Sequence, residues 1–219
     1  MKKQFIVIGL GRFGGSLTTT LISLGHEVMA IDRNPRRIQE YSGLISHIYN
    51  ADSTDEQVLR DLGVRNIDHA IVAIGDDLQA SILTTLILKE LGVKKITAKA
   101  TNDYHHKVLE RIGADHIIRP ERDTGIRVAH QITSKNLIDY LELSPEYSLV
   151  EVSAPSSMSG KTLKTLNIRA KYGCNIVAIK TKENQMIVSP QADDKINEGD
   201  VLVIIGNNRD VNRFEISYE

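Results

Sequence analysis

The run Phe5-Ile6-Val7-Ile8-Gly9-Leu10-Gly11-Arg12-Phe13-Gly14-Gly15 decides the fold of the first half of this chain. Its apolar half predicts a buried strand, and the spacing Gly9-x-Gly11-x-x-Gly14 follows at once. In a strand–turn–helix unit, Gly9 makes the tight turn, Gly11 lets a pyrophosphate approach the backbone, and Gly14 lets helix and strand pack closely. Residues 16–24 are expected to form the helix, and the N–H groups at its start favour an anion.

A second apolar run, residues 27–32, ends in Asp32. A carboxylate at the end of the second strand can accept hydrogen bonds from both ribose hydroxyls of an adenosine. The alternative is that the glycines serve only the packing of helix on strand, without a bound nucleotide. This alternative does not explain the acid at position 32. The sequence therefore predicts a site for an adenine nucleotide at this end of the strands.

Short apolar, β-branched runs alternate with helix patterns up to about residue 120. The predicted strands are residues 5–8, 28–31, 46–49, 70–74, 96–99 and 116–118. Such continuous runs suit a parallel sheet covered on both faces. Asn34-Pro35, Ser53-x-x-Glu56 and Asp76-x-x-Gln79 are read as helix starts, and Gly25, Gly43, Gly63, Gly92 and Gly113 as helix ends. The predicted fold is α/β, a Rossmann-type doubly wound parallel sheet over residues 1–120.

The alternation ends at Pro120-Glu121. Residues 121–142 have a helical apolar pattern and are predicted to form one long helix. It could cross over to another subunit, or it could be an ordinary helix that covers its own sheet. Leu143-Ser144-Pro145 is expected to break it, so that 121–143 is a linker domain and 144–219 a small α+β lobe. Predicted elements of this lobe are strands 147–153, 175–181, 185–189 and 201–205 and helices 160–166 and 207–214.

The composition is that of an ordinary globular protein. The 219 residues are 41% apolar and 25% charged, with a formal net charge of −1. No segment has the basic excess that nucleic-acid binding requires. The lone Cys174 excludes an intramolecular disulfide framework and favours an intracellular location. No signal peptide and no 18-residue apolar run are recognised, so a membrane role is expected to come through a partner.

Arg12 bears on which nucleotide is bound, because dehydrogenases usually keep an uncharged residue at this place in the loop. A guanidinium there can reach a terminal phosphate, which suits ATP or ADP better than NAD. Arg33 could meet the 2′-phosphate of NADP, but Asp32 would repel that group. Asn50-Ala51-Asp52 is expected to flank adenine, with Asp52 alternatively starting the next helix, and Gly75-Asp76 to line the same crevice.

No catalytic apparatus accompanies this site. All seven histidines lie at or before His130, and His105-His106 are read as surface residues. There is no GxxxxGK[ST] motif for P-loop hydrolysis. A sensor, not an enzyme, is the favoured interpretation. An NAD(H)-binding redox sensor or oxidoreductase is the alternative, and a SAM-dependent methyltransferase would usually need an added antiparallel strand.

Further stretches complete a resemblance to a known family. They are Asp52-Ser53-Thr54-Asp55, Ile71-Val72-Ala73-Ile74-Gly75, Gln79-Ala80-Ser81, Lys99-Ala100, His105 to Leu109, Ile112-Gly113-Ala114-Asp115, Pro120-Glu121, Asn167-x-Arg169-Ala170-Lys171-Tyr172-Gly173 and Val201 to Ile204. With the glycine loop, Asp32 and Asn34, they resemble the RCK (KTN) domains, and in particular the cytosolic gating subunits of bacterial Ktr potassium transporters. The resemblance covers essentially the whole chain.

The resemblance implies homodimers that assemble into an octameric ring beneath a membrane-embedded ion-translocating subunit. ATP would favour an activating ring shape and ADP an inactivating one. Arg12 and Lys99 would lie near the phosphates, Asp32 and Asn34 near the ribose and adenosine, and Glu121 would bind a divalent cation, Mg²⁺ or Ca²⁺, beside the γ-phosphate. Glu121 alternatively serves as a carboxylate at a helix start. The predicted nucleotide site comprises Gly9, Gly11, Arg12, Phe13, Gly14, Asp32, Arg33, Asn34, Asn50, Ala51, Asp52, Gly75, Lys99 and Glu121.

Several members of the resembled family bind cyclic di-AMP in the C-terminal lobe. The positions that match are Arg169, Ala170, Asn175, Ile176 and Pro190. Arg169 would hold a phosphate and the apolar residues would face adenine. Leu163-Lys164 departs from the pair of aliphatic residues expected there.

Overall fold

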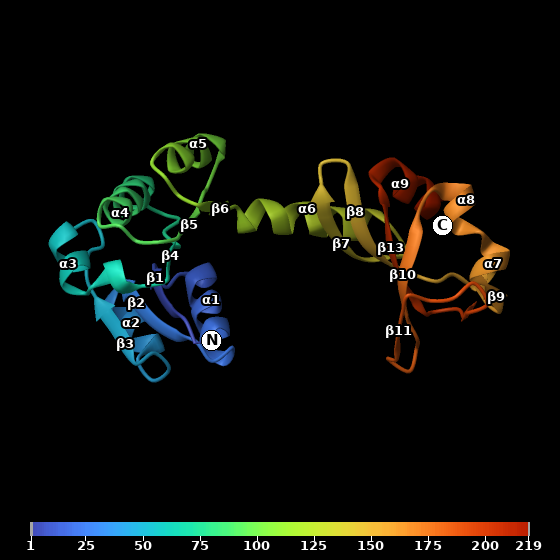
Figure 1. Ribbon diagram of the computed structural model, residues 1–219, viewed down its shortest axis with the longest axis horizontal. Coiled ribbons are helices and arrows are strands. Elements are labelled where there is room, and N and C mark those ends of the chain that lie inside the picture. Colours follow the sequence, from blue (N-terminus) through green and yellow to red (C-terminus); the bar gives the residue numbers. More distant parts are fainter. Residues whose placement is uncertain (1, 219) are drawn as a thin grey trace. The chain divides into compact units, whose positions relative to one another are not determined.

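The structure, a computed structural model, describes residues 2–218. Contacts within the chain divide it after Pro120 into two compact units with separate apolar cores (Figure 1). Within residues 2–218, no helix combines the length and the apolar character needed to cross a membrane.

A six-stranded parallel sheet forms the first unit. Its strands are β1 (Gln4–Ile8), β2 (Glu27–Asp32), β3 (His47–Asn50), β4 (His69–Val72), β5 (Ile96–Lys99) and β6 (His116–Ile118). They lie in the order β3-β2-β1-β4-β5-β6, which confirms the predicted doubly wound fold. The order reverses between β1 and β4, and ligands of open α/β sheets bind at the carboxyl ends of strands at such a point.

Helices cover both faces of this sheet because alternate residues of each strand point to opposite faces. The helices are α1 (Arg12–Ser23), α2 (Pro35–Tyr41), α3 (Glu56–Asp61), α4 (Leu78–Glu90) and α5 (Asp103–Arg111), with a 3₁₀ turn η1 (Val64–Asn66). Helices α1 and α2 lie on one side of the sheet and α3, α4 and α5 on the other (Figure 1). Val7 packs with side chains of α1, whereas Ile6 and Ile8 pack with side chains of α3, α4 and α5. All three residues are fully buried or nearly so.

Helix starts were predicted with mixed success. Asn34 caps α2 as predicted, accepting a hydrogen bond from Arg36 N at 3.0 Å, with Pro35 in the first turn. The predicted caps Ser53 and Asp76 are wrong. Asp55 and Asp77 cap α3 and α4 instead.

Helix ends follow the glycines more closely. Gly25, Gly63, Gly92 and Gly113 have φ between +69° and +97°, the left-handed conformation that ends a helix. Gly43 has no such φ and simply continues the loop after α2.

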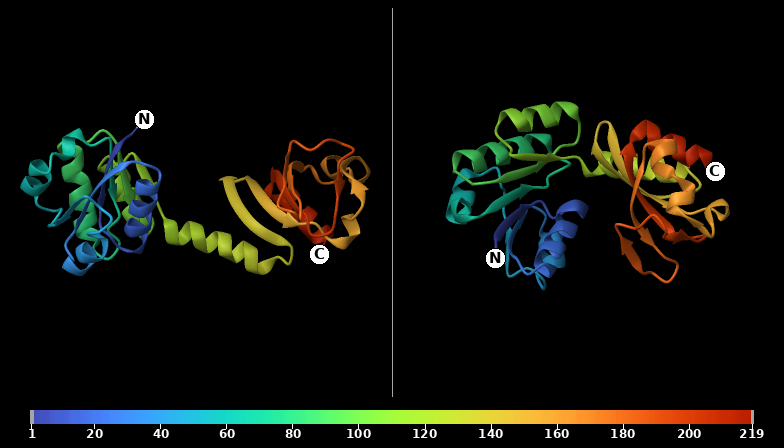
Figure 2. Two further views of the ribbon diagram at one scale, coloured as in Figure 1. Left: turned by 90° about the horizontal axis from the view of Figure 1, so that it is seen from below. Right: turned by 45° about the vertical axis from the view of Figure 1, so that its right-hand side comes forward.

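The second unit begins at Glu121, in the first turn of α6 (Pro120–Thr133), and is built on an antiparallel sheet. Its strands are β7 (Leu137–Ser144), β8 (Tyr147–Ser153), β10 (Asn175–Lys180), β11 (Met186–Val188) and β13 (Val201–Asn207), in the order β11-β10-β13-β8-β7. A two-stranded sheet pairs β9 (Lys161–Thr162) with β12 (Lys195–Ile196). Its other helical elements are η2 (Ser156–Met158), α7 (Leu163–Leu166), α8 (Ile168–Tyr172) and α9 (Asn208–Ser217). Helix α9 packs on β8 and β13, with Phe214 fully buried (Figure 2).

The prediction of one helix over residues 121–142 is wrong in its second half. Helix α6 ends at Thr133, and β7 starts four residues later, at Leu137. It pairs with β8, with Tyr140 opposite Val150. Leu143-Ser144-Pro145 therefore breaks no helix. Ser144 pairs with Tyr147 at the turn of a hairpin. The predicted helix 160–166 is likewise shorter, since Lys161 and Thr162 pair with β12 before α7 begins.

Candidate nucleotide site

The glycine loop continues β1 and runs directly into α1. Gly9 has a φ of +96°, which a residue with a side chain adopts only with strain. A Cβ atom on Gly14 would lie 1.8 Å from the carbonyl oxygen of Gly9, so only glycine lets the helix approach the turn this closely. The tasks predicted for Gly9 and Gly14 match this geometry.

Asp32 ties the end of β2 to this loop. Its Oδ2 accepts a hydrogen bond from Leu10 N at 2.7 Å, and its Oδ1 accepts one from Asn34 N at 2.7 Å. Asn50 Nδ2 donates to the carbonyl oxygen of Asp32 at 2.9 Å. An ionised carboxylate has about four acceptor positions, so two backbone donors leave it able to accept from ribose hydroxyls as well.

Helix α2 holds the same loop from the other side, through two residues that the sequence analysis missed. Arg37 Nη1 donates to the carbonyl oxygen of Leu10 at 2.7 Å and would lie 3.0 Å from a Cβ on Gly11. The hydroxyl of Tyr41 would lie 2.0 Å from a Cβ on Gly15. Their spacing of four residues, which puts two side chains on one face of a helix, is the signal that could have found them.

Helix α1 starts directly after the glycine loop, at the carboxyl end of β1. Gly11 occupies the N-cap position and makes no side-chain hydrogen bond to the N–H groups of the first turn. Arg12, the first residue of the helix, is exposed. Free N–H groups together with the helix dipole favour a phosphate at this point.

Charged residues surround the crevice at the ends of β2 and β4. Arg33 Nη1 pairs with Asp77 Oδ2 at 2.8 Å. Hydrogen bonds from Ala80 N and from Arg33 hold the pKa of Asp77 below its usual value. Bonds from Thr54 do the same for the pKa of Asp52, with a smaller contribution from Arg33.

The loop predicted to flank adenine is anchored from both ends. Ala51 N donates to the carbonyl oxygen of Asp32 at 3.3 Å. Ser53, expected to be a helix cap, is buried, and its hydroxyl forms a hydrogen bond of 2.8 Å with that of Thr84 on α4. The structure thereby brings residues 50–52 next to Asp32.

Lys99 and Gly75 meet at the ends of β5 and β4. A Cβ on Gly75 would lie 3.2 Å from Lys99 Nζ, so the absence of a side chain gives the ammonium group room. The two residues thus lie at one edge of the sheet with the glycine loop. Phe13 packs into the apolar cluster below α1 and presents no polar group to the crevice.

Glu121 lies in the first turn of α6 and belongs to the second unit. Within residues 2–218, no group of three or more His, Cys, Asp or Glu side chains is placed to hold a metal ion. A cation at Glu121 would need further ligands, such as water molecules or the phosphates of a nucleotide.

The residues predicted for cyclic di-AMP gather at one corner of the second unit. Arg169 and Ala170 are exposed on α8, and Asn175 and Ile176 begin β10. Ser189 N donates to the carbonyl oxygen of Val177 at 3.0 Å, which brings Pro190 beside the start of β10.

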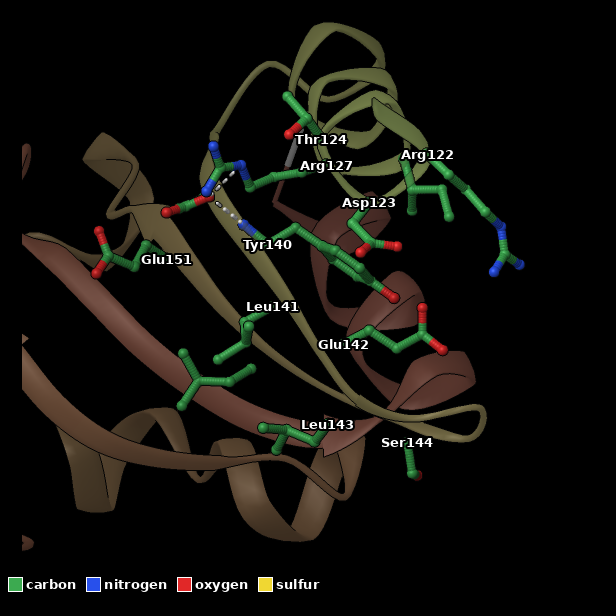
Figure 3. A pocket seen from close by; sticks show the side chains of 13 residues that line it. Arg122, Asp123, Thr124, Arg127, Tyr140, Leu141, Glu142, Leu143, Ser144 and Glu151 are labelled. Atoms are coloured by element: carbon green, nitrogen blue, oxygen red, sulfur yellow. Dashed lines mark hydrogen bonds and ion pairs between the residues drawn. The ribbon is translucent and has the colours of Figure 1, made fainter. Parts of the chain in front are cut away.

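A separate hollow of about 720 Å³ lies between α6 and the β7–β8 hairpin (Figure 3). Arg127 Nε lies 3.8 Å from Asp139 Oδ1 at its wall, and Tyr140 and Glu142 line it from β7. None of the predicted site residues lines it.

The histidines of α5 differ from expectation. His105, read as a surface residue, is 1% exposed, and its Nδ1 lies 3.3 Å from Thr101 N. Burial lowers the pKa of this imidazole.

Comparisons with known proteins match both units. The TrkA-N domain model matches residues 5–120 and the TrkA-C domain model residues 147–215. The chain is 60% identical over 215 residues to the Ktr system potassium uptake protein C of Bacillus subtilis (strain 168), covering 98% of this chain and 97% of that protein. It is 50% identical over 213 residues to the Ktr system potassium uptake protein A of the same organism, covering 97% and 96%.

Among solved structures, the GsuK RCK domain matches 99% of this chain with a TM-score of 0.52 and 24% identity. The match spans 46% of that chain, a little under half of its length. At this identity the likeness concerns the fold alone.

Proposed function

Because this chain belongs to the family that joins a TrkA-N to a TrkA-C domain and includes the Ktr system potassium uptake proteins, we propose that it is the ATP/ADP-sensing regulatory subunit of a Ktr-type potassium uptake system. The observation that carries the nucleotide assignment is the Asp32 carboxylate, which holds the glycine loop at 2.7 Å beside the uncapped start of α1. Ribose and phosphate groups each have a suitable partner there. The protein senses and does not catalyse.

Equilibrium binding of ATP, ADP, NADH and SAM to the purified protein tests this assignment. ATP and ADP should bind more tightly than the other two. Tight binding of NADH, with turnover of a substrate, would instead establish the redox alternative. The sequence has no tryptophan, so intrinsic indole emission does not interfere with fluorescent nucleotides.

ATP and ADP differ by one phosphate, so only contacts with that group can favour one assembly shape over another. Moving an equilibrium from 1:99 to 99:1 takes about 5.5 kcal/mol of differential binding. Shared among the eight sites of a ring, this is below about 1 kcal/mol each, within the range of one charged contact. Arg12, exposed at the first position of α1, is the residue we assign to this contact, together with Glu121 acting through a bound metal ion.

Arg12→Ala should narrow the difference between the affinities for ATP and ADP. Arg36→Ala, which removes the same charge from an exposed position on α2, is the control. Unchanged discrimination in the Arg12 variant would refute the assigned role.

The divalent cation is assigned to Glu121, with the γ-phosphate as its second partner. When bound, Mg²⁺ or Ca²⁺ would neutralise phosphate charge next to a carboxylate that already lies in the favoured first turn of a helix. Glu121→Gln should lower the dependence of ATP affinity on the cation and leave ADP affinity in the absence of cation unchanged.

The C-terminal lobe is assigned to cyclic di-AMP, with Arg169 on a phosphate and with Ala170, Asn175, Ile176 and Pro190 around adenine. Their convergence at one corner of the unit supports this assignment. Arg169→Ala should weaken cyclic di-AMP binding while leaving ATP binding intact, and Lys171→Ala, two residues away, is the matched control.

The partner is the membrane-embedded Ktr subunit, and the chain acts at the cytoplasmic face of the membrane as dimers assembled into an octameric ring. Apolar side chains remain exposed on α6 and β7, and they include Val128, Ile132, Ile138 and Leu141. Such a surface suits contact with another subunit. Mass measurement in solution with and without ATP tests the assembly.

A further inference from the structure

Arg33 and Asp77 form an ion pair across the ends of three strands. Arg33 directly follows β2, and Asp77 precedes α4 on the connection from β4. Strand β1 lies between β2 and β4, and its continuation is the glycine loop. The pair, with 2.8 Å between Nη1 and Oδ2, therefore bridges the two sides of the crevice that Asp32 lines.

Asp77 is a fixed anchor for this bridge. Its Oδ1 caps α4 by accepting a hydrogen bond from Ala80 N at 2.9 Å, so its Oδ2 has a set direction. The guanidinium of Arg33 is also attracted by Asp76 and Asp52, and the pKa of Arg33 is raised by these neighbours, Asp77 first. The side chain of Arg33 is nonetheless 61% exposed. One nitrogen of the guanidinium group is thus bonded to Asp77, while much of the Arg33 side chain remains accessible to solvent.

A guanidinium is planar and can use its edge and its face at the same time. The edge pairs with a carboxylate, and the face stacks on an aromatic ring. Arg33 directly follows Asp32, so the base of an adenosine whose ribose binds Asp32 would come within reach of the exposed Arg33 side chain. The anchored residues 50–52 flank the same place from the end of β3.

Resting on the proposed adenine-nucleotide site, we propose that Arg33 is the purine-recognising lid of this site and that Asp77 positions it. The pair joins the chain that follows β2 to the chain that leads into α4. When nucleotide binds, Nη1 stays on Asp77 and the flat face of the guanidinium covers one face of the adenine. Arg33 thereby acts on the base, which ATP and ADP share, whereas Arg12 acts on the phosphate in which they differ.

Because Arg33 contacts the base and Arg12 the terminal phosphate, two predictions can be tested separately. Removal of the Arg33 guanidinium lowers the affinities for ATP and for ADP by the same factor, because both nucleotides make the base contact. It also lowers the preference for a purine over a pyrimidine, because a smaller ring gains less from the same stacking surface.

The test measures dissociation constants of ATP, ADP and UTP for the full-length protein and its variants. Arg33→Ala should raise the constants for ATP and ADP about fivefold, and that for UTP less, as expected for an exposed cation–π contact. Arg33→Lys keeps the charge but not the plane and should resemble Arg33→Ala. Asp77→Asn keeps the helix cap, since Asn caps as well as Asp, and should give a smaller rise because the guanidinium is less firmly held.

Arg36→Ala, which removes the same charge from an exposed position on α2, is the matched control and should leave all three constants unchanged. An exposed ion pair contributes little to stability, so thermal unfolding of the Arg33 variants should match that of the parent protein. An unchanged ratio of ATP to UTP affinity in Arg33→Ala, or full rescue by Arg33→Lys, overturns the lid.

The outcome for the parent protein separates the two proposals. If it binds neither ATP nor ADP, the proposed function fails and the lid fails with it. If it binds both nucleotides and Arg33→Ala keeps the parent's base preference, only the lid is overturned.

Discussion

Leu10, in the middle of the glycine loop, has both backbone polar groups engaged. Asp32 accepts from its N–H at 2.7 Å, and Arg37 donates to its carbonyl oxygen at 2.7 Å. The loop conformation is therefore set before any ligand arrives. Preorganisation of this kind lowers the entropy lost on binding and so strengthens it.

Gly14→Ala should destabilise the first unit by about 3 kcal/mol and abolish nucleotide binding, because its Cβ would lie 1.8 Å from the carbonyl oxygen of Gly9. Denaturant unfolding and ATP binding measure the two effects. Gly43→Ala is the control, since a Cβ there meets nothing within 4 Å. Parent-like behaviour of Gly14→Ala would show that the loop can move aside.

At the level of single residues, the glycine motif and the acid at the end of the second strand correctly predicted the structural roles of residues that belong to the motif itself. Gly9, Gly14 and Asp32 do in the structure what their types and spacing indicate. Arg37 and Asp77 escaped prediction because their contacts depend on how α2 and α4 dock on the sheet. The four-residue spacing of Arg37 and Tyr41 indicates that they share one face of α2, but it does not say that this face meets the glycine loop.

Helix α3 shows how a cap is chosen. The pattern Ser53-x-x-Glu56 has capping-box spacing, yet Asp55 accepts from Gln57 N at 2.9 Å and starts the helix. Ser53 instead makes a buried hydrogen bond to Thr84. The Ser53 hydroxyl, which the local pattern predicted to cap the helix, thus forms a hydrogen bond with Thr84, a residue distant in the sequence.

Asp55→Ala should lower the free energy of unfolding by about 1 kcal/mol, the usual effect of losing a cap. Asp55→Asn should be close to neutral, because the amide oxygen can accept the same bond. Urea titration of both variants gives the comparison. Equal losses in the two would mean that the charge of Asp55, and not its capping bond, is what matters.

Elements of the first sheet were predictable because each strand is a continuous apolar run between turn signals. Strand β7 was not, since its apolar residues also fit a helix and only one of its eight residues, Leu137, is buried. Its pairing with β8, which lies beyond a two-residue turn, decided between the two structures. Pairing partners are tertiary information that a pattern within one segment lacks.

The whole molecule combines two cores that should respond to pH in opposite directions. In the first unit, burial lowers the pKa of His105, so the unfolded chain takes up a proton that the folded unit refuses. That stability is present above the ordinary histidine pKa and is lost as pH falls through it. In the second unit, burial raises the pKa of Cys174 to about 11 and that of Tyr218 to about 12. The contribution of the Cys174 thiol to the free energy of unfolding is fully present below its unfolded pKa near 9 and is lost as pH rises toward 11. The contribution of Tyr218 is lost at higher pH, as pH rises toward 12.

Cys174→Ala should flatten the alkaline arm of a stability profile measured from pH 5 to 11, by about 2 kcal/mol at the high end for a shift of this size. It should leave the acid arm as it is. His105→Gln should do the reverse, flattening the acid arm. Denaturant unfolding at each pH provides the profiles, and an alkaline arm that persists unchanged in Cys174→Ala would remove the thiol as its cause.

The burial of Cys174 also makes the chain convenient for spectroscopy. This is the sole thiol in the sequence, it is fully shielded, and its high pKa keeps it in the unreactive protonated form at neutral pH. Cysteines introduced at exposed positions can therefore be labelled selectively with maleimide dyes or nitroxides while the native residue is kept. A pair of such labels, one in each unit, would record distance changes as different nucleotides are added.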